Sequence, residues 1–160
     1  MAIPKISLNK IVKKKPKVCT PGMKITEAAA LMQKENCGCL PVVESTGRLF
    51  PIGMITDRDI VCRTIAKGLN PMNMLVKDCM TKGCHTIDST ATLNDANRIM
   101  DSKKIGRIVL IDKNGKAAGV LSKADLEEYA YTSEEPSSRE VVSKPLGRAK
   151  AKAPPLARVH

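Results

Sequence analysis

A motif of about 45 residues occurs twice in this sequence, and this duplication constrains the fold more than any other feature. The stretch Gly38-Cys39-Leu40-Pro41-Val42-Val43-Glu44 returns 68 positions later as Gly106-Arg107-Ile108-Val109-Leu110-Ile111-Asp112. The stretch that starts at Gly53 returns at Gly119, now offset by 66 positions. Repetition of this kind indicates copies of one structural unit. Because a unit this short buries too little surface to be stable alone, we expect the two copies to pack face to face in one globular body.

The repeats divide the 160 residues of the chain into five parts. We expect a basic lead-in at 1–17, a first repeat at 18–68, a linker with a second lead-in at 69–83, a second repeat at 84–131, and a basic, disordered tail at 132–160. Apolar residues at helical spacing predict a helix over Ile25, Ala28, Ala29 and Met32. Asn114-Gly115 between two apolar runs predicts a hairpin. Each repeat is predicted to hold a short strand, a helix, two strands and a helix, which makes an α+β fold.

The net charge of +11 lies mostly at the two ends of the chain. Residues 1–17 contain six Lys and no acidic residue, and residues 133–160 contain six Lys or Arg against three Glu. The body between them is nearly neutral, whereas a nucleic-acid-binding fold usually carries a basic face. One Phe, two Tyr and no Trp also leave few rings for base stacking. Nucleic-acid binding by a dimer through its basic ends is therefore the alternative function, not the leading one.

Several classes of protein are disfavoured by motifs that the sequence lacks. It has neither a secretory signal nor an apolar run of membrane-spanning length, so we expect a cytoplasmic protein with free thiols. Its cysteines are not spaced as CxxC pairs, and its only histidines are His85 and His160, so we expect no metal site. A GxxxxGK[ST] loop, an HExxH motif and a serine elbow are also missing. We therefore expect no enzyme activity and no cofactor.

The motif with chemical content is Gly53-Met54-Ile55-Thr56-Asp57-Arg58-Asp59, which recurs as Gly119-Val120-Leu121-Ser122-Lys123-Ala124-Asp125. In each copy a Thr or Ser ends a strand, and an Asp follows in the first turn of a helix. This spacing is that of a capping box, which satisfies the free backbone donors at a helix start. It also suits a nucleotide, because a helix start with a hydroxyl attracts phosphate and a nearby carboxylate accepts hydrogen bonds from ribose. The motif alone leaves both interpretations open.

Taken in order, these motifs resemble a tandem pair of cystathionine-β-synthase-type (CBS) domains. The resemblance covers about residues 6–131 and rests on Thr26-Glu27-Ala28 with Met32, on residues 40–44, on residues 53–59 and on their counterparts in the second copy. It implies two β-α-β-β-α units that pack with pseudo-twofold symmetry into a disc with clefts between them. In such pairs the clefts commonly bind AMP, ADP, ATP or S-adenosylmethionine. The implied function is a non-catalytic regulatory module that acts through homodimerisation or through a regulated partner protein.

The resemblance also carries over a set of nucleotide-binding positions. The hydroxyl and carboxylate positions are Thr56 with Asp59 and Ser122 with Asp125. Adenine is expected beside Thr20, Leu40, Pro41 and Val42 in one cleft and beside Ile87, Ile108 and Val109 in the other. Phosphate is expected near Arg58, Arg107 and Lys123. The apolar positions are equally suited to a core, and the basic ones to a solvated surface. Because the second copy replaces Pro41 by Val109 and Asp57-Arg58 by Lys123-Ala124, we expect the two clefts to bind ligand unequally.

Overall fold

Helical and alternating apolar patterns fold the first repeat into a small sheet covered by helices. The computed structural model, which describes residues 6–10 and 16–132, contains α1 (Ile25–Glu35), β1 (Cys39–Ser45), β2 (Arg48–Thr56) and α2 (Asp57–Arg63) in this order. Ile25, Ala28 and Met32 of α1 are buried as their spacing predicts, whereas Ala29 is exposed, so the buried stripe is narrower than predicted. Helix α2 ends at Arg63, and a separate short 3-10 helix, η2 (Ile65–Lys67), follows it. The break follows from Thr64, whose hydroxyl bonds to the carbonyl of Ile60 and whose backbone leaves the helical region.

The second repeat is built on the same plan. After the 3-10 helix η3 (Pro71–Asn73) come α3 (Val76–Cys79), β3 (Thr81–Lys82), β4 (Thr86–Asp88), α4 (Leu93–Lys103), β5 (Arg107–Ile111), β6 (Ala117–Ser122) and α5 (Lys123–Thr132). The two sheets have the orders β1-β2-β3 and β4-β5-β6. All pairings are antiparallel except that of β4 with β5, which is parallel. The predicted short strand before the first helix is β4 here, and in the first repeat it is a single parallel bridge between Cys19 and Val42.

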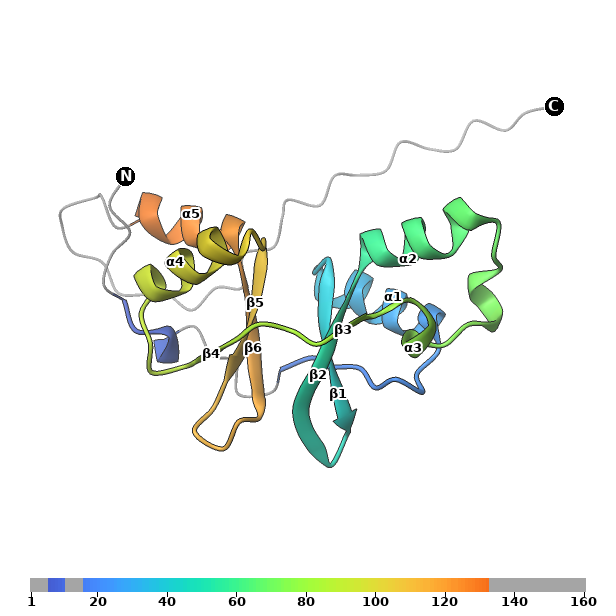
Figure 1. Ribbon diagram of the computed structural model, residues 1–160, viewed down its shortest axis with the longest axis horizontal. Helices are drawn as coiled ribbons and strands as arrows, with labels where there is room; N and C mark the ends of the chain where they lie inside the picture. Colours follow the sequence, from blue (N-terminus) through green and yellow to red (C-terminus); the bar gives the residue numbers. More distant parts are fainter. Residues whose placement is uncertain (1–5, 11–15, 133–160) are drawn as a thin grey trace.

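The two sheets face each other, and their helices cover the outer faces (Figure 1). Strand alternation sorts the side chains into three clusters. Leu40, Val42 and Ile55 join the core between the first sheet and its helices, and the second repeat has an equivalent core around Ile108, Leu110 and Leu121. A third cluster of Val43, Val109 and Ala117 lies between the repeats, with Leu49, Met54 and Ile111 packed against it. This arrangement confirms the expected face-to-face packing of two α+β units.

Each repeat completes its core with a segment that precedes the other repeat. Leu8, in the 3-10 helix η1 (Leu8–Lys10), is fully buried in the core of the second repeat. Its amide donates to the carbonyl of Ala91 at 2.8 Å. Val76 of α3 is likewise buried in the core of the first repeat, and its amide donates to the carbonyl of Met23 at 2.8 Å. The duplication therefore extends back to Leu8 and Val76, and the two repeats hold each other reciprocally.

None of the helices within residues 6–10 and 16–132 is long and apolar enough to cross a membrane. The tail from 133 onward and most of the basic lead-in lie outside the described residues. Predictions that rest on those basic residues therefore stay predictions.

Candidate functional site

The two copies of the hydroxyl–carboxylate motif lie at matching places, where a central strand runs into a helix. Thr56 follows Ile55, which is buried in the core of the first repeat, so alternation turns Thr56 toward the second repeat. Ser122 follows the buried Leu121 in the same way and faces the first repeat. Helices α2 and α5 thus begin on the face that the two repeats share.

Both helix starts are anchored to the strand that opens the hairpin of their own repeat. The amide of Asp57 donates to the carbonyl of Gly38 at 3.1 Å, and the amide of Lys123 donates to the carbonyl of Gly106 at 3.0 Å. Gly38 precedes β1 and Gly106 precedes β5. Each helix start therefore lies beside the beginning of the neighbouring strand.

Both motifs form capping boxes. In the first, the amide and hydroxyl of Thr56 each donate to Oδ2 of Asp59 at 2.9 Å, and the amide of Asp59 donates to the Thr56 hydroxyl at 3.0 Å. In the second, the amide and hydroxyl of Ser122 each donate to Oδ2 of Asp125 at 2.7 Å, and the amide of Asp125 donates back at 3.2 Å. Capping therefore uses one carboxylate oxygen of each acid, and the Oδ1 atoms are left for other partners.

The Oδ1 atoms of the two acids have different surroundings. Oδ1 of Asp59 lies 3.3 Å from Nη2 of Arg63, one turn further along α2. Oδ1 of Asp125 makes no ion pair with any side chain in the described part of the chain. The two copies of the motif are thus alike in capping and unlike in the charge that meets the second oxygen.

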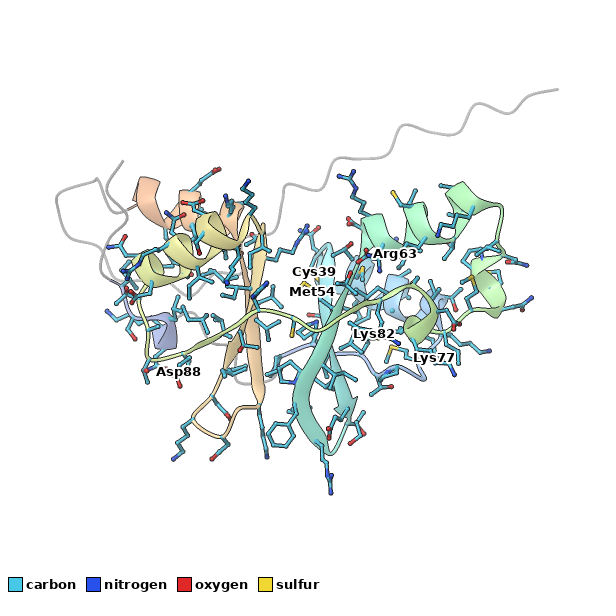
Figure 2. All side chains as sticks on the ribbon, viewed as in Figure 1. Cys39, Met54, Arg63, Lys77, Lys82 and Asp88 are labelled. Atoms are coloured by element: carbon cyan, nitrogen blue, oxygen red, sulfur yellow. The ribbon has the colours of Figure 1, made fainter. Side chains whose placement is uncertain are left out.

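Charged and thiol side chains from both repeats gather around Gly38 and Cys39. A Cβ atom placed on Gly38 would lie 2.9 Å from Oδ2 of Asp57 and 3.6 Å from Nη2 of Arg107. Burial raises the pKa of the Cys39 thiol to about 11. The charge of Arg107 opposes this rise, and Cys37, Asp125 and Asp57 add to it. Cys39 lies, with Met54, where the two sheets meet (Figure 2). The starts of β1, β5, α2 and α5 therefore converge on one place between the repeats.

Of the three predicted phosphate-binding cations, Arg107 fits this place best. Its side chain is exposed, and no ion pair of the described residues involves its guanidinium. Lys123 instead reaches α4 of its own repeat, where Nζ lies 2.8 Å from Oδ1 of Asp101. Arg58 is exposed on α2. The structure thus brings Arg107 to the junction of the repeats and directs Lys123 away from it.

The predicted adenine positions divide into core residues and residues of the shared face. The side chains buried in the cores of their own repeats are those of Leu40, Val42, Ile87 and Ile108. Val109 belongs to the cluster between the repeats, and Pro41, also buried, accepts a hydrogen bond from the amide of Cys19 at 3.0 Å. Thr20 follows this bridge and is partly exposed. A ligand between the repeats would therefore meet Pro41, Val109 and Thr20 before it met the core side chains.

Three residues near the candidate site were not among the positions predicted from the sequence: Cys39, Asp57 and Arg63. Cys39 could have been found from the sequence, because it occupies the position in the first repeat that Arg107 occupies in the second. Asp57 and Lys123 correspond in the same way. Within residues 6–10 and 16–132, no three His, Cys, Asp or Glu side chains gather closely enough to hold a metal ion.

Comparison with known proteins agrees with the duplication and the fold. The family model described as "CBS domain" matches this chain twice, at residues 8–63 and 76–131. The chain belongs to the CBS domain family. The two matches begin at Leu8 and at Val76, which lie in the segments that each complete the core of the other repeat, and each match includes a complete repeat.

Similar proteins include both curated relatives and solved structures. The chain is 34% identical to the CBS domain-containing protein YhcV of Bacillus subtilis, over 74% of this chain and 81% of that protein. It is 27% identical to the uncharacterized protein MK0525 of Methanopyrus kandleri, over 76% of this chain but only 61% of that protein. CBSX2, crystallised in complex with AMP, superposes with a TM-score of 0.68, 18% identity and coverage of 81% of this chain and 99% of that one. The CBS domain pair of MJ0100, in complex with 5′-methylthioadenosine and S-adenosyl-L-methionine, gives a TM-score of 0.69, 21% identity and coverage of 82% and 100%.

Proposed function

We propose that this chain is a non-catalytic regulatory module that binds an adenosine-type ligand between its two CBS repeats. The observation that carries the proposal is the convergence of Arg107 with Asp57 and with Asp125, the capping-box carboxylate of the second repeat, around Gly38 and Cys39 at the junction of the repeats. The guanidinium of Arg107 makes no ion pair with the part of the chain that the structure describes, and it suits a phosphate or a carboxylate group. Oδ1 of Asp125, which makes no ion pair within residues 6–10 and 16–132, suits a ribose hydroxyl. Support from relatives comes from CBSX2 and MJ0100, which have the same fold and were crystallised with AMP and with S-adenosyl-L-methionine.

The two motifs are expected to bind unequally. Arg63 already holds Oδ1 of Asp59, whereas Oδ1 of Asp125 has no such ion pair among the described residues. A ribose hydroxyl would have to share Asp59 with Arg63. We therefore expect tighter binding on the Asp125 side.

Calorimetric titration with AMP, ADP, ATP and S-adenosylmethionine tests the proposal. Asp125→Ala and Asp59→Ala are each expected to weaken the binding of the preferred ligand at one site. The control is Asp95→Ala, because Asp95 forms the same capping box with Thr92 at the start of α4 but lies outside the junction. If none of the four ligands binds at physiological concentrations, or if Asp95→Ala weakens binding as much as the other two variants, the proposal is wrong.

We propose that this module signals through association of two copies of the chain. The large apolar side chains exposed at one end of the first repeat are Val61, Ile65, Leu69 and Met72, with exposures of 47–64%. Exposed apolar clusters of this kind mark protein–protein contacts. Sedimentation velocity of the wild type and of Ile65→Lys, with and without ligand, measures the effect: the wild type should dimerise and Ile65→Lys should not. A monomeric wild type at all concentrations would contradict this part of the proposal.

The alternative, nucleic-acid binding through the basic ends, depends on residues outside the described part of the chain. Binding of RNA or DNA that falls steeply with added salt, and that is lost when residues 1–17 and 133–160 are removed, would favour it.

A further inference from the structure

Two opposite charges from different repeats lie close together at the junction: Arg107 of the second repeat and Asp57 of the first. A Cβ atom on Gly38 would lie 3.6 Å from Nη2 of Arg107 and 2.9 Å from Oδ2 of Asp57, so the sum of these distances, 6.5 Å, is the largest separation of the two atoms. They are more than 4.0 Å apart, because the two side chains form no ion pair with each other. A guanidinium and a carboxylate thus face one place without being joined.

Arg107 also lies beside the capping box of its own repeat. In the second sheet it is the partner of Ser122 on β6, and the hydroxyl of Ser122 donates to Oδ2 of Asp125 at 2.7 Å. The proposed function places the ribose of the ligand on Asp125. The group attached to the 5′ carbon of that ribose is then expected near Arg107 and Asp57.

The charges at this place are mixed and not simply basic. Burial is the main cause of the raised pKa of the Cys39 thiol; among the charged side chains, Arg107 opposes the rise, and Asp125 and Asp57 add to it. Lys123, which holds the position of Asp57 in the second repeat, is paired with α4 instead. A chain of phosphates on Arg107 would therefore meet carboxylates, whereas a carboxylate with an ammonium group beside it would find a partner for each charge.

We propose that Asp57 is a specificity-determining residue, which makes the junction select adenosine ligands whose anionic group carries a positive charge beside it. The amino-acid head of S-adenosylmethionine is such a group, because its carboxylate fits the guanidinium of Arg107 and its ammonium fits the carboxylate of Asp57. The phosphates of ADP and ATP also fit Arg107, but Asp57 repels them. This inference rests on the proposed function, because it needs an adenosine ligand in the junction.

The size of the effect follows from the separation of the charges. Two unit charges 6.5 Å apart change an affinity by about three-fold when they are screened as in bulk water, and by about 70-fold at the effective dielectric constant near a protein surface. Asp57 and Arg107 are exposed, which favours the lower part of this range. We therefore expect Asp57 to change the affinity for each charged ligand by about three- to ten-fold.

Calorimetric titration with S-adenosylmethionine, 5′-methylthioadenosine and ATP, in EDTA so that ATP keeps its full charge, tests the inference. The wild type should bind S-adenosylmethionine more tightly than ATP or 5′-methylthioadenosine, which lacks the amino-acid head. Asp57→Asn keeps the shape of the side chain; it should weaken the binding of S-adenosylmethionine and strengthen that of ATP, each by about three- to ten-fold. Asp57→Lys introduces the residue type of the second repeat and should shift both affinities further in the same directions.

Two other variants serve as controls. Glu44→Gln removes the same charge from the far end of β1, where Glu44 is exposed. It lies six residues from Gly38, about 20 Å along the strand, which is well beyond the Debye length of about 8 Å at physiological ionic strength. Glu44→Gln should leave both affinities unchanged. Arg107→Gln should weaken S-adenosylmethionine and ATP together, because both ligands use its guanidinium.

The outcomes distinguish this inference from the proposed function. If the wild type binds none of AMP, ADP, ATP and S-adenosylmethionine, the proposed function fails and the inference fails with it. If the wild type binds ATP or 5′-methylthioadenosine as tightly as S-adenosylmethionine, the inference is overturned while the proposed function stands. A change in the ratio of the ATP and S-adenosylmethionine affinities that is no larger in Asp57→Asn than in Glu44→Gln also overturns it.

Discussion

Gly53→Ala should destabilise the protein strongly, because the segment that joins the two repeats, residues 79–82, passes directly beside this glycine. Gly53 lies in β2 opposite Lys82 of β3. A Cβ atom on it would come closer than 3.0 Å to the carbonyl oxygen of Thr81 and to Cε of Met80, a separation that real Cβ atoms essentially never show. The Met80 methyl group can move aside. The Thr81 carbonyl is backbone, and its displacement pulls β3 away from β2.

The expected size follows from two contributions. Overpacking of this kind costs about 1–3 kcal/mol, and loss of a β2–β3 hydrogen bond adds about 1 kcal/mol. We therefore expect Gly53→Ala to lower the free energy of unfolding by roughly 2–4 kcal/mol. The matched control is Gly119→Ala, the same motif position in the second repeat. There the nearest atom to a Cβ is Cδ1 of Leu110 at 3.7 Å, an ordinary contact, and the φ angle is not left-handed. That variant should be stabilised by about 0.4–1 kcal/mol.

Urea unfolding followed by far-UV circular dichroism measures both variants. The two variants are expected to change the free energy of unfolding in opposite directions. This difference is decisive, because the two glycines occupy equivalent positions of the repeats and differ in the atoms that lie beside them. If the two variants change the free energy of unfolding by amounts within about 0.5 kcal/mol of each other, the size of a typical neutral surface effect, the reasoning is refuted.

Three further predictions follow from burial and hydrogen bonding. Leu8→Ala should lower the free energy of unfolding by about 2–5 kcal/mol in the same urea assay, since Leu8 is fully buried in the second repeat, and its exposed neighbour Asn9→Ala should not. Burial raises the pKa of Cys19 to about 12, so mass spectrometry after alkylation near neutral pH should find the exposed Cys62 modified well before Cys19; the reverse order would contradict the packing. Hydrogen bonds from Thr92 hold the pKa of Asp95 below its ordinary value of 3.8. A lowered folded-state pKa stabilises the fold above pH 3.8, and this contribution is lost as the pH falls through the folded value. Carboxyl NMR titration should show the pKa of Asp95 rise toward 3.8 in Thr92→Val, and an unchanged value would refute the assigned cause.

Much of the fold was predictable because duplication and apolar periodicity act locally. Residues 40–43 and 108–111 alternate between two buried faces, which fixes them as central strands once two copies must cover each other. Asn114-Gly115 lies in the predicted hairpin turn, where Gly115 has a φ of 75°. Patterns of this kind identify buried residues and turns without reference to distant parts of the chain.

The exchange of lead-in segments could not be predicted in the same way. Leu8 and Val76 are apolar and occur at the repeat offset, which indicates burial. Nothing in their pattern says whether they complete their own repeat or the other one. That choice depends on how the two sheets pack.

The candidate site was predictable in part. The pattern identified the two capping boxes, because their residues occur in duplicate positions. Arg107 followed only from the family resemblance, because its duplicate position holds Cys39. Arg63 and Cys39 have no duplicate of their own type, and their contacts join segments 16 or more residues apart or join the two repeats. Such contacts arise only from the tertiary fold.

The most direct measurement is an amide NMR titration of the assigned protein with its preferred adenosine ligand. Binding between the repeats should shift the amides of Gly38, Cys39, Arg107 and Ser122 first and leave α1 and α4, on the outer faces, unchanged. Shifts confined to α1 or α4, with the junction unaffected, would contradict a ligand site between the repeats.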